Sequence, residues 1–347
     1  MIHKQAELHN VEELVRVEGR PGLLMQRVPE SVRAGLLEKG REQIRRAALL
    51  EIRFGLEMGT ASITLASFGG VSQVKVFYGD YEVESRQIGE TPTTIEIADE
   101  GPEPGFQFRS PWSEGVPRPS FGPIWRILVH GHEVHLLGLE GEGLRPPASH
   151  EQPALRYLAY GTSITFGIAA SSPEVTYVAQ TAWRLGLDAL NLGMPGSAHC
   201  EQAIAEHIAA RDDWDIATLC ISVNMLNQGI PADRFADQAA AMIRTISAAH
   251  PGKPLVCIGL FPSFADLGWT WPEREVRSTS GEYRAALRDV VQRCGFPQVK
   301  YVNGGELLDD WRGLSHDLLH PAGSGMIQIG ERLASVMRPL LPGVPKI

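Results

Sequence analysis

A serine, an aspartate and a histidine at two distant points of the chain could together form an acyl-transfer site. Ser163 lies in the segment GTSITFG, residues 161–167, and Asp317 and His320 lie in HDLLHP, residues 316–321. A serine hydroxyl attacks an ester efficiently only when a base removes its proton, and a histidine oriented by a carboxylate can be that base. These residue types predict Ser163 as the nucleophile, His320 as the base and Asp317 as the group that orients the imidazole.

An ester-cleaving site also needs hydrogen-bond donors for the negative charge that develops on the carbonyl oxygen. Three candidate donors are the backbone N–H of Ser163, the backbone N–H of Gly196 in NLGMPGSAHCE (191–201), and the side-chain amide of Asn224 in SVNMLNQ (222–228). A glycine at position 196 would allow backbone angles that other residues avoid. We therefore predict these three groups as the oxyanion donors.

The second half of the chain shows the alternation that would bring these segments together. Short apolar runs alternate with amphipathic helical patterns, which predicts a parallel sheet covered by helices on both faces. The predicted strands are 156–161, 188–193, 215–223, 254–261 and 299–304, and the predicted helices are 176–186, 200–211, 232–250, 281–294 and 323–341. Ligands of such sheets bind at the carboxyl ends of the strands, where the candidate residues are found.

The first half has a different pattern. One helix is predicted over residues 31–50, with Ser31 as its N-cap. The strand-like runs that follow it are EIRFGLE, ASITLASF, SQVKVFYG, TTIEIA, IWRILVHG and EVHLLGLEG. Many short strands separated by turn residues predict a β-sandwich or jelly roll. The proline-rich segment 145–153 is interpreted as a linker, so the predicted domains are residues 1–150 and 151–347.

Composition narrows the possible functions. The chain has 347 residues, and its 32 basic and 41 acidic side chains give a net charge of −9, which argues against nucleic acid or anionic membrane as a partner. The N-terminus lacks a signal-peptide pattern and no long apolar run occurs, so we expect a cytoplasmic protein. Its four scattered cysteines fit a reducing compartment, and Cys220 and Cys257 are expected to be buried. The oligomeric state is not predictable.

The four segments resemble, in order and rough spacing, the four blocks of the SGNH or GDSL hydrolase superfamily. GTS resembles the block with the nucleophile, NLGMPG the block with the oxyanion glycine, SVN the block with the oxyanion asparagine, and DLLHP the block with the aspartate and histidine. The resemblance implies a three-layer, flavodoxin-like α/β domain that needs no cofactor. The whole chain resembles a branch with an N-terminal β-sandwich, which includes salicylyl-transferring acyltransferases of tetracycline-type biosynthesis.

Three positions depart from the family pattern. Thr162 stands where the first block has aspartate, and Ser222 and Met225 stand where the third block has glycine and aspartate. None of the replaced residues is the nucleophile, the base or an oxyanion donor. We therefore expect the departures to affect the range of substrates and not catalysis itself.

Each candidate also has a plainer interpretation. A serine between a strand and a helix is more often an N-cap than a nucleophile, so Ser163 depends on the presence of DLLHP for its assignment. Asp317 and His320 could be an ordinary loop pair. Asn224 and Gly196 could each serve a turn, and Gly193 is interpreted as structural only.

Other polar and aromatic residues near the second block have no clear motif. His199, Glu201 and His207 lack a metal-ligand spacing and are interpreted as surface or rim residues, and Cys200 is expected to pack. The aromatic pair of segment 269–271 could form a wall of the site or fold onto its own domain.

The sequence therefore predicts a serine esterase acting on a small-molecule or carbohydrate ester through an acyl-Ser163 intermediate. An acyltransferase with the same triad, which passes the acyl group to an alcohol, is the first alternative. A non-catalytic carbohydrate-binding protein is the second.

Overall fold

The computed structural model describes residues 1–98 and 120–341. The chain forms two compact units. The first contains residues 1–28, 45–154 and 186–188, and the second contains residues 29–44, 155–185 and those from Ala189 onward. The main boundary lies four residues beyond the one we expected. Segment 29–44 belongs to the second unit, which the prediction of a single domain over residues 1–150 did not anticipate.

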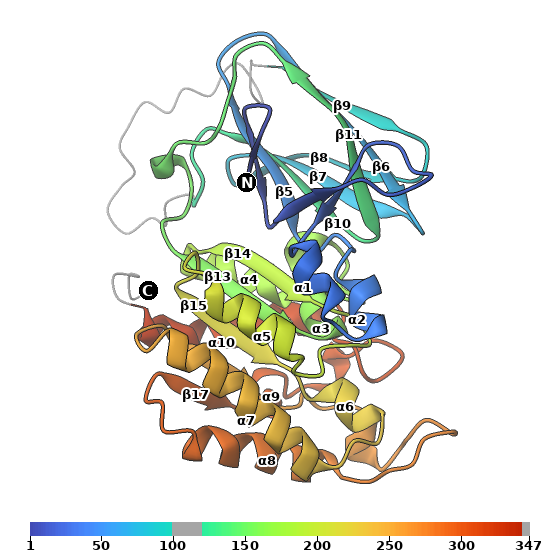
Figure 1. Ribbon diagram of the computed structural model, residues 1–347, viewed down its shortest axis with the longest axis vertical. Helices are drawn as coiled ribbons and strands as arrows, with labels where there is room; N and C mark the ends of the chain where they lie inside the picture. Colours follow the sequence, from blue (N-terminus) through green and yellow to red (C-terminus); the bar gives the residue numbers. More distant parts are fainter. Residues whose placement is uncertain (99–119, 342–347) are drawn as a thin grey trace. The chain divides into compact units, whose positions relative to one another are not determined.

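The first unit contains two antiparallel sheets (Figure 1). The strand order of the first sheet is β1-β2-β5-β10-β7-β8, with β12 paired to β5: β1 (Ile2–His3), β2 (Ala6–His9), β5 (Leu50–Leu56), β10 (Trp125–His130), β7 (Ser72–Tyr78), β8 (Tyr81–Ile88) and β12 (Leu144–Arg145). The order of the second is β3-β4-β11-β6-β9: β3 (Glu13–Val15), β4 (Leu23–Gln26), β11 (Glu133–Gly141), β6 (Thr60–Phe68) and β9 (Thr93–Ala98).

Both sheets contribute to one hydrophobic core. Ile52 and Ile127 come from the first sheet, and Ile63 and Leu136 from the second. Alternate residues of a strand face opposite sides of its sheet, so strands with one buried face show alternating burial, as β6 does. Alternating or β-rich runs of sequence made six of the strands visible, and in β5 nearly every residue is buried.

The strands that the sequence did not indicate lack that signal. Most residues of β8 are exposed, so its polar sequence carries no apolar repeat. Strands β1 to β4 have only two to four residues each, which is too short for a pattern to emerge.

The single helix predicted over residues 31–50 is wrong. Two short helices replace it, α1 (Glu30–Ala34) and α2 (Glu38–Gln43), and the N-cap of α1 is Pro29 and not Ser31. One glycine directly follows α1 and another lies inside α2, and glycine has a low helix propensity.

The predicted linker is an ordered part of the first unit. Within it, a short 3-10 helix spans Ser149–Glu151. The Glu151 carboxylate is buried and accepts two hydrogen bonds from the Arg145 guanidinium, at 2.6 and 2.7 Å. A paired, buried carboxylate fixes this segment, so its proline and polar residues do not make it a flexible connection.

The second unit is built on a five-stranded sheet in the order β14-β13-β15-β16-β17 (Figure 1). Its strands are β13 (Arg156–Gly161), β14 (Asp188–Gly193), β15 (Ile216–Cys220), β16 (Leu255–Ile258) and β17 (Val299–Val302). The pairs β13–β15, β15–β16 and β16–β17 are parallel. In chain order this arrangement is 2-1-3-4-5, the order of flavodoxin-like doubly wound folds, so the predicted parallel α/β architecture is confirmed.

Helices cover both faces of this sheet. Helices α5 (Gln202–Ala210), α7 (Ala232–Ala249) and α8 (Ser280–Arg293) pack side by side on one face, and α4 (Tyr177–Leu185) packs against α10 (Gly323–Met337) on the other (Figure 1). Every residue of β15 and β16 is buried, as expected for strands covered on both faces. None of the helices in the described part of the chain is long and apolar enough to cross a membrane.

Three short helices complete the second unit at the ends of its strands. They are α3 (Ser163–Phe166), α6 (Val223–Asn227) and α9 (Gly304–Leu307). The first two follow β13 and β15 directly, so both begin at the carboxyl edge of the sheet, where the candidate residues lie.

Candidate active site

Ser163 is the first residue of α3, at the point where the chain leaves β13. The N-cap of α3 is Thr162, whose hydroxyl accepts a long hydrogen bond of 3.4 Å from the backbone N–H of Ile164. The plainer interpretation of Ser163 as an N-cap is therefore wrong. Thr162, which stands where the similar family block has aspartate, fills that position and leaves the Ser163 hydroxyl available.

The structure brings Ser163, His320 and Asp317 together. Nε2 of His320 lies 2.8 Å from Oγ of Ser163, and Nδ1 of His320 lies 2.6 Å from Oδ2 of Asp317. Ser163 is 6% exposed, whereas the neighbouring His316 is exposed to solvent. A serine, an imidazole and a carboxylate joined in this order can transfer a proton away from the hydroxyl.

The loop that carries the histidine and the aspartate is a tight turn. Its two ends pair through an isolated bridge between Leu314 and Pro321, and the N–H of Ser315 donates to the carbonyl of His320 at 2.8 Å. Leu318 has a φ of +51°, a conformation that residues other than glycine seldom adopt. The turn brings residues three positions apart into hydrogen-bond contact.

The Asp317 carboxylate is held by more than the imidazole. Oδ1 of Asp317 accepts hydrogen bonds from Oγ of Ser315 at 2.7 Å and from the N–H groups of Leu319 and His320, both at 2.9 Å. Burial by itself would raise the pKa of Asp317, but the hydrogen bonds from His320 and Ser315 hold it well below its usual range. The group is therefore a carboxylate at neutral pH. Sequence reasoning missed Ser315, whose only signal is its position two residues before the aspartate.

The two other predicted oxyanion residues lie in neighbouring segments, Gly196 on the loop after β14 and Asn224 in the short helix α6. Gly196 is exposed and has a φ of +68°, which favours glycine. Asn224, in α6, donates a hydrogen bond from Nδ2 to the carbonyl oxygen of Ser197, the residue after Gly196. An amide nitrogen has two hydrogens, so one N–H of Asn224 remains for a substrate. Within residues 1–98 and 120–341, the backbone N–H of Gly196 has no hydrogen-bond acceptor.

The loop that carries Gly196, together with the end of β14 before it, is hydrogen-bonded to the segment around Ser163. The N–H of Met194 donates to the carbonyl of Gly161 at 2.8 Å, and the side chain of Asn191 donates to the carbonyl of Thr165 at 2.8 Å. A Cβ on Gly193 would lie 2.2 Å from the backbone nitrogen of Phe166, so only glycine permits this approach. The structural interpretation of Gly193 is confirmed, whereas the anchoring role of Asn191 was not predicted.

Glu201 is a buried anchor of the same loop. Its carboxylate accepts hydrogen bonds from Oγ of Ser197 at 3.1 Å, from the N–H of His199 at 2.9 Å and from the hydroxyl of Tyr160 at 2.8 Å. Glu201 and His207 are each only 9% exposed, so their interpretation as rim residues is wrong. The described residues contain no group of histidine, cysteine and acidic side chains that could hold a metal ion.

Cys200 is buried, as are Cys220 and Cys257, which confirms the expectation for these residues. Burial raises the pKa of the Cys200 thiol well above its usual value, so the reactive thiolate form is disfavoured. Trp271 stacks edge-on against Phe264 with ring centres 5.6 Å apart. Trp271 is still 48% exposed, so it only partly folds onto its own unit.

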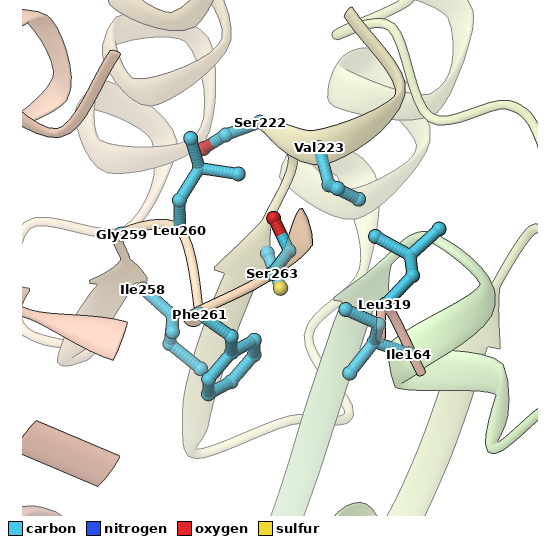
Figure 2. Close-up of a pocket in the computed structure, with 10 residues that line it drawn as sticks. Ile164, Ser222, Val223, Ile258, Gly259, Leu260, Phe261, Ser263 and Leu319 are labelled. Carbon is cyan, nitrogen blue, oxygen red and sulfur yellow. The ribbon is translucent and has the colours of Figure 1, made fainter. Parts of the chain in front are cut away.

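A small apolar hollow lies next to the triad segments (Figure 2). Ile164, which follows the nucleophile, and Leu319, which precedes the histidine, form one side of it. The rest of the lining comes from the ends of β15 and β16: Cys220, Ser222, Val223, Ile258, Gly259, Leu260, Phe261 and Ser263. Its volume of about 10 Å³ is room for about one water-sized group.

Residues 159–326 match the GDSL-like lipase/acylhydrolase family. The protein is a member of the SGNH/GDSL hydrolase superfamily. The four sequence blocks thus identified the superfamily correctly. The protein is an SGNH-type enzyme. No curated protein sequence matches the chain significantly.

Several solved structures are similar to this SGNH/GDSL member over nearly its whole length, including both of its units. The salicylyl-acyltransferase SsfX3 from a tetracycline biosynthetic pathway is 17% identical, with a TM-score of 0.76 over 99% of this chain and 97% of that one. A putative GDSL-like lipase from Bacteroides ovatus is 16% identical, with a TM-score of 0.66 over 96% and 97%. The acetyl xylan esterase Est2A from Butyrivibrio proteoclasticus is 9% identical, with a TM-score of 0.59 over 98% and 96%. At these identities, the likeness concerns the fold alone.

Proposed function

We propose that this SGNH/GDSL member is a serine esterase that acts on a small-molecule or carbohydrate ester through an acyl-Ser163 intermediate. The observation that carries the proposal is the continuous series of contacts from Asp317 through His320 to Ser163, at 2.6 and 2.8 Å. The ionised Asp317 fixes the imidazole with Nδ1 protonated, so that Nε2 is left to accept the serine proton.

The proposed reaction has two halves. In the first, Nε2 of His320 takes the Ser163 proton while Oγ attacks the ester carbon, and the resulting oxyanion binds the N–H groups of Ser163, Gly196 and Asn224. His320 then gives the proton to the departing alcohol, which leaves the acyl group on Ser163. In the second half, His320 takes a proton from water, the hydroxide adds to the acyl carbon, and the acid departs as Ser163 regains its proton.

The apolar hollow is the proposed seat of the acyl group's terminal carbon. It lies between residues that adjoin the nucleophile and the base, and its lining is almost entirely apolar. The hollow has room for about one water-sized group, so a terminal methyl group already fills it and longer acyl chains require the lining to move. We therefore favour a small acyl group, such as acetyl, as the acid part of the ester.

Acyl transfer to an alcohol is the second candidate activity. It uses the same intermediate, with an acceptor hydroxyl in place of water, and the likeness to a salicylyl-acyltransferase over nearly the whole chain favours it. A purely carbohydrate-binding role is disfavoured because it leaves the connected serine, histidine and aspartate without a use. The first unit, with two antiparallel sheets on one core, fits an accessory β-sandwich.

One assay series tests the proposal. The protein should release aryl alcohol from aryl acetate and lose this activity in Ser163→Ala. Alcohols are then added at increasing concentrations, and the amounts of free acid and of newly formed ester are measured. Their ratio gives the partition of the acyl group between water and the alcohol. Acid as the main product at all alcohol concentrations indicates a hydrolase, and a saturable shift to ester indicates an acyltransferase. Equal turnover by wild type and Ser163→Ala contradicts both.

A further inference from the structure

The loop that carries Gly196 has an unusual backbone. Gly196, Ala198 and Cys200 have φ values of +68°, +68° and +60°. Two of these residues are not glycine, and a side chain makes such a conformation unfavourable. Conformations of this kind persist only where the surrounding structure holds them. The position of the Gly196 N–H therefore depends on what packs against the loop.

Contacts within the second unit hold the loop through Met194, Asn191 and Glu201, as described above. Helix α2, which comes from a part of the sequence more than 150 residues away, also packs against the loop. A Cβ on Gly40 would lie 3.0 Å from Oγ of Ser197 and 3.4 Å from Oε1 of Glu201. Gly40 is buried, and its lack of a side chain lets α2 lie directly on the loop.

Two further contacts fix the same segment. The Lys39 side chain passes Gly196, with its Cε 3.8 Å from the position of a Cβ on that glycine. A Cβ on Gly35, the residue after α1, would lie 2.8 Å from Cβ of Ala203 in α5. The end of α1 therefore also packs closely against the start of α5, where the loop ends. These contacts all lie within the second unit, to which residues 29–44 belong.

We propose that α1 and α2 support catalysis by holding in place the loop that carries Gly196, residues 194–201, called here the oxyanion loop. Gly40 positions this loop by allowing α2 to pack directly on Ser197 and Glu201. Gly40 is a positioning residue because it acts through the loop and touches no substrate. This inference rests on the proposed function. It also explains why residues 29–44 leave the first unit between β4 and β5, although they lie outside the part of the chain that matches the family.

The test uses the full chain and a graded pair of variants, Gly40→Ala and Gly40→Val. A Cβ at position 40 pushes α2 and the loop apart by a few tenths of an ångström, and the branched valine pushes further. The matched controls are Gly281→Ala and Gly281→Val in α8, where a Cβ meets nothing closer than Oγ1 of Thr279 at 3.9 Å. Thermal unfolding of all four variants and of the wild type reports on the fold.

The catalytic readouts are kcat and KM for an aryl acetate and the inhibition constant of phenylboronic acid, which forms a tetrahedral adduct with an active serine. Displacing one oxyanion donor weakens binding of the transition state and not of the substrate. We expect kcat to fall about 10-fold or more in Gly40→Val and less in Gly40→Ala, with KM nearly unchanged. The boronic acid should bind more weakly by a factor that follows kcat, while both Gly281 variants match the wild type.

Wild-type kcat in a folded Gly40→Val contradicts the inference, and so does a fall in kcat that Gly281→Val reproduces. A rise in KM alone, with unchanged boronic acid inhibition, also overturns it, because α2 would then be a substrate contact. These outcomes are distinct from a failure of the proposed function, which would appear as full activity in Ser163→Ala.

Discussion

Replacing Asn224 by alanine separates transition-state binding from substrate binding. The structure gives the Asn224 amide two tasks. One N–H is donated to the carbonyl of Ser197, and the other is left for the oxyanion. Asn224→Ala removes both without placing a new group in the site.

The size of the effect follows from those two hydrogen bonds. Removing one oxyanion donor lowers kcat by on the order of 100-fold, or about 3 kcal/mol in activation free energy. Losing the bond to the Ser197 carbonyl costs about 1 kcal/mol in the free energy of unfolding. The substrate's ground-state carbonyl carries little charge, so KM should change little.

The assay is steady-state kinetics on an aryl acetate, together with urea unfolding of both proteins. The predicted signature is a kcat about 100-fold lower, a KM within about twofold of wild type, and a stable fold. If KM rises while kcat is kept, Asn224 contacts the substrate and does not stabilise the oxyanion. If kcat and KM are both unchanged, Asn224 has only the structural task of holding Ser197.

Two further predictions concern the base and its carboxylate. His320→Ala should be nearly inactive, and Asp317→Asn should be impaired equally or less. His316→Ala should keep its activity, because His316 is exposed and lies outside the triad contacts. Steady-state kinetics on the same ester measures all three variants, and an inactive His316→Ala beside an active His320→Ala would show that His316 is the base. The low pKa of Asp317 in the folded state means that its ionised form stabilises the fold above the usual aspartate pKa of 3.8, and that this contribution is lost as the pH falls further. Urea unfolding should therefore find Asp317→Asn less stable than wild type at pH 7, with a difference that shrinks near pH 3, and a difference independent of pH would contradict this.

Much of the second unit could be predicted because its signals are local. Apolar strands and amphipathic helices alternate along the chain, and Ser163, Gly196 and Asn224 each lie within four residues of the end of a strand. Residues at strand ends in a parallel sheet share one edge, so Ser163, Gly196 and Asn224 could be expected to meet there. The histidine and aspartate needed only the spacing within DLLHP.

The missed features depend on contacts between residues far apart in sequence. Glu201 looks like a surface residue because its partners Tyr160 and Ser197 cannot be identified from charge or spacing alone. The packing of Gly40 on the oxyanion loop is invisible for the same reason, since a glycine inside a charged helix carries no pattern. Polar anchors of this kind are specified by tertiary packing, which leaves no periodic trace.

The most direct test of the account is to locate the nucleophile chemically. An aryl phosphonate that reacts with activated serines is incubated with wild type, with Ser163→Ala and with His320→Ala, and the labelled peptide is mapped by mass spectrometry. The account predicts one label on wild type, at Ser163, no label on Ser163→Ala, and greatly slowed labelling of folded His320→Ala. A label on another serine of the wild type, or full esterase activity in Ser163→Ala, would contradict it.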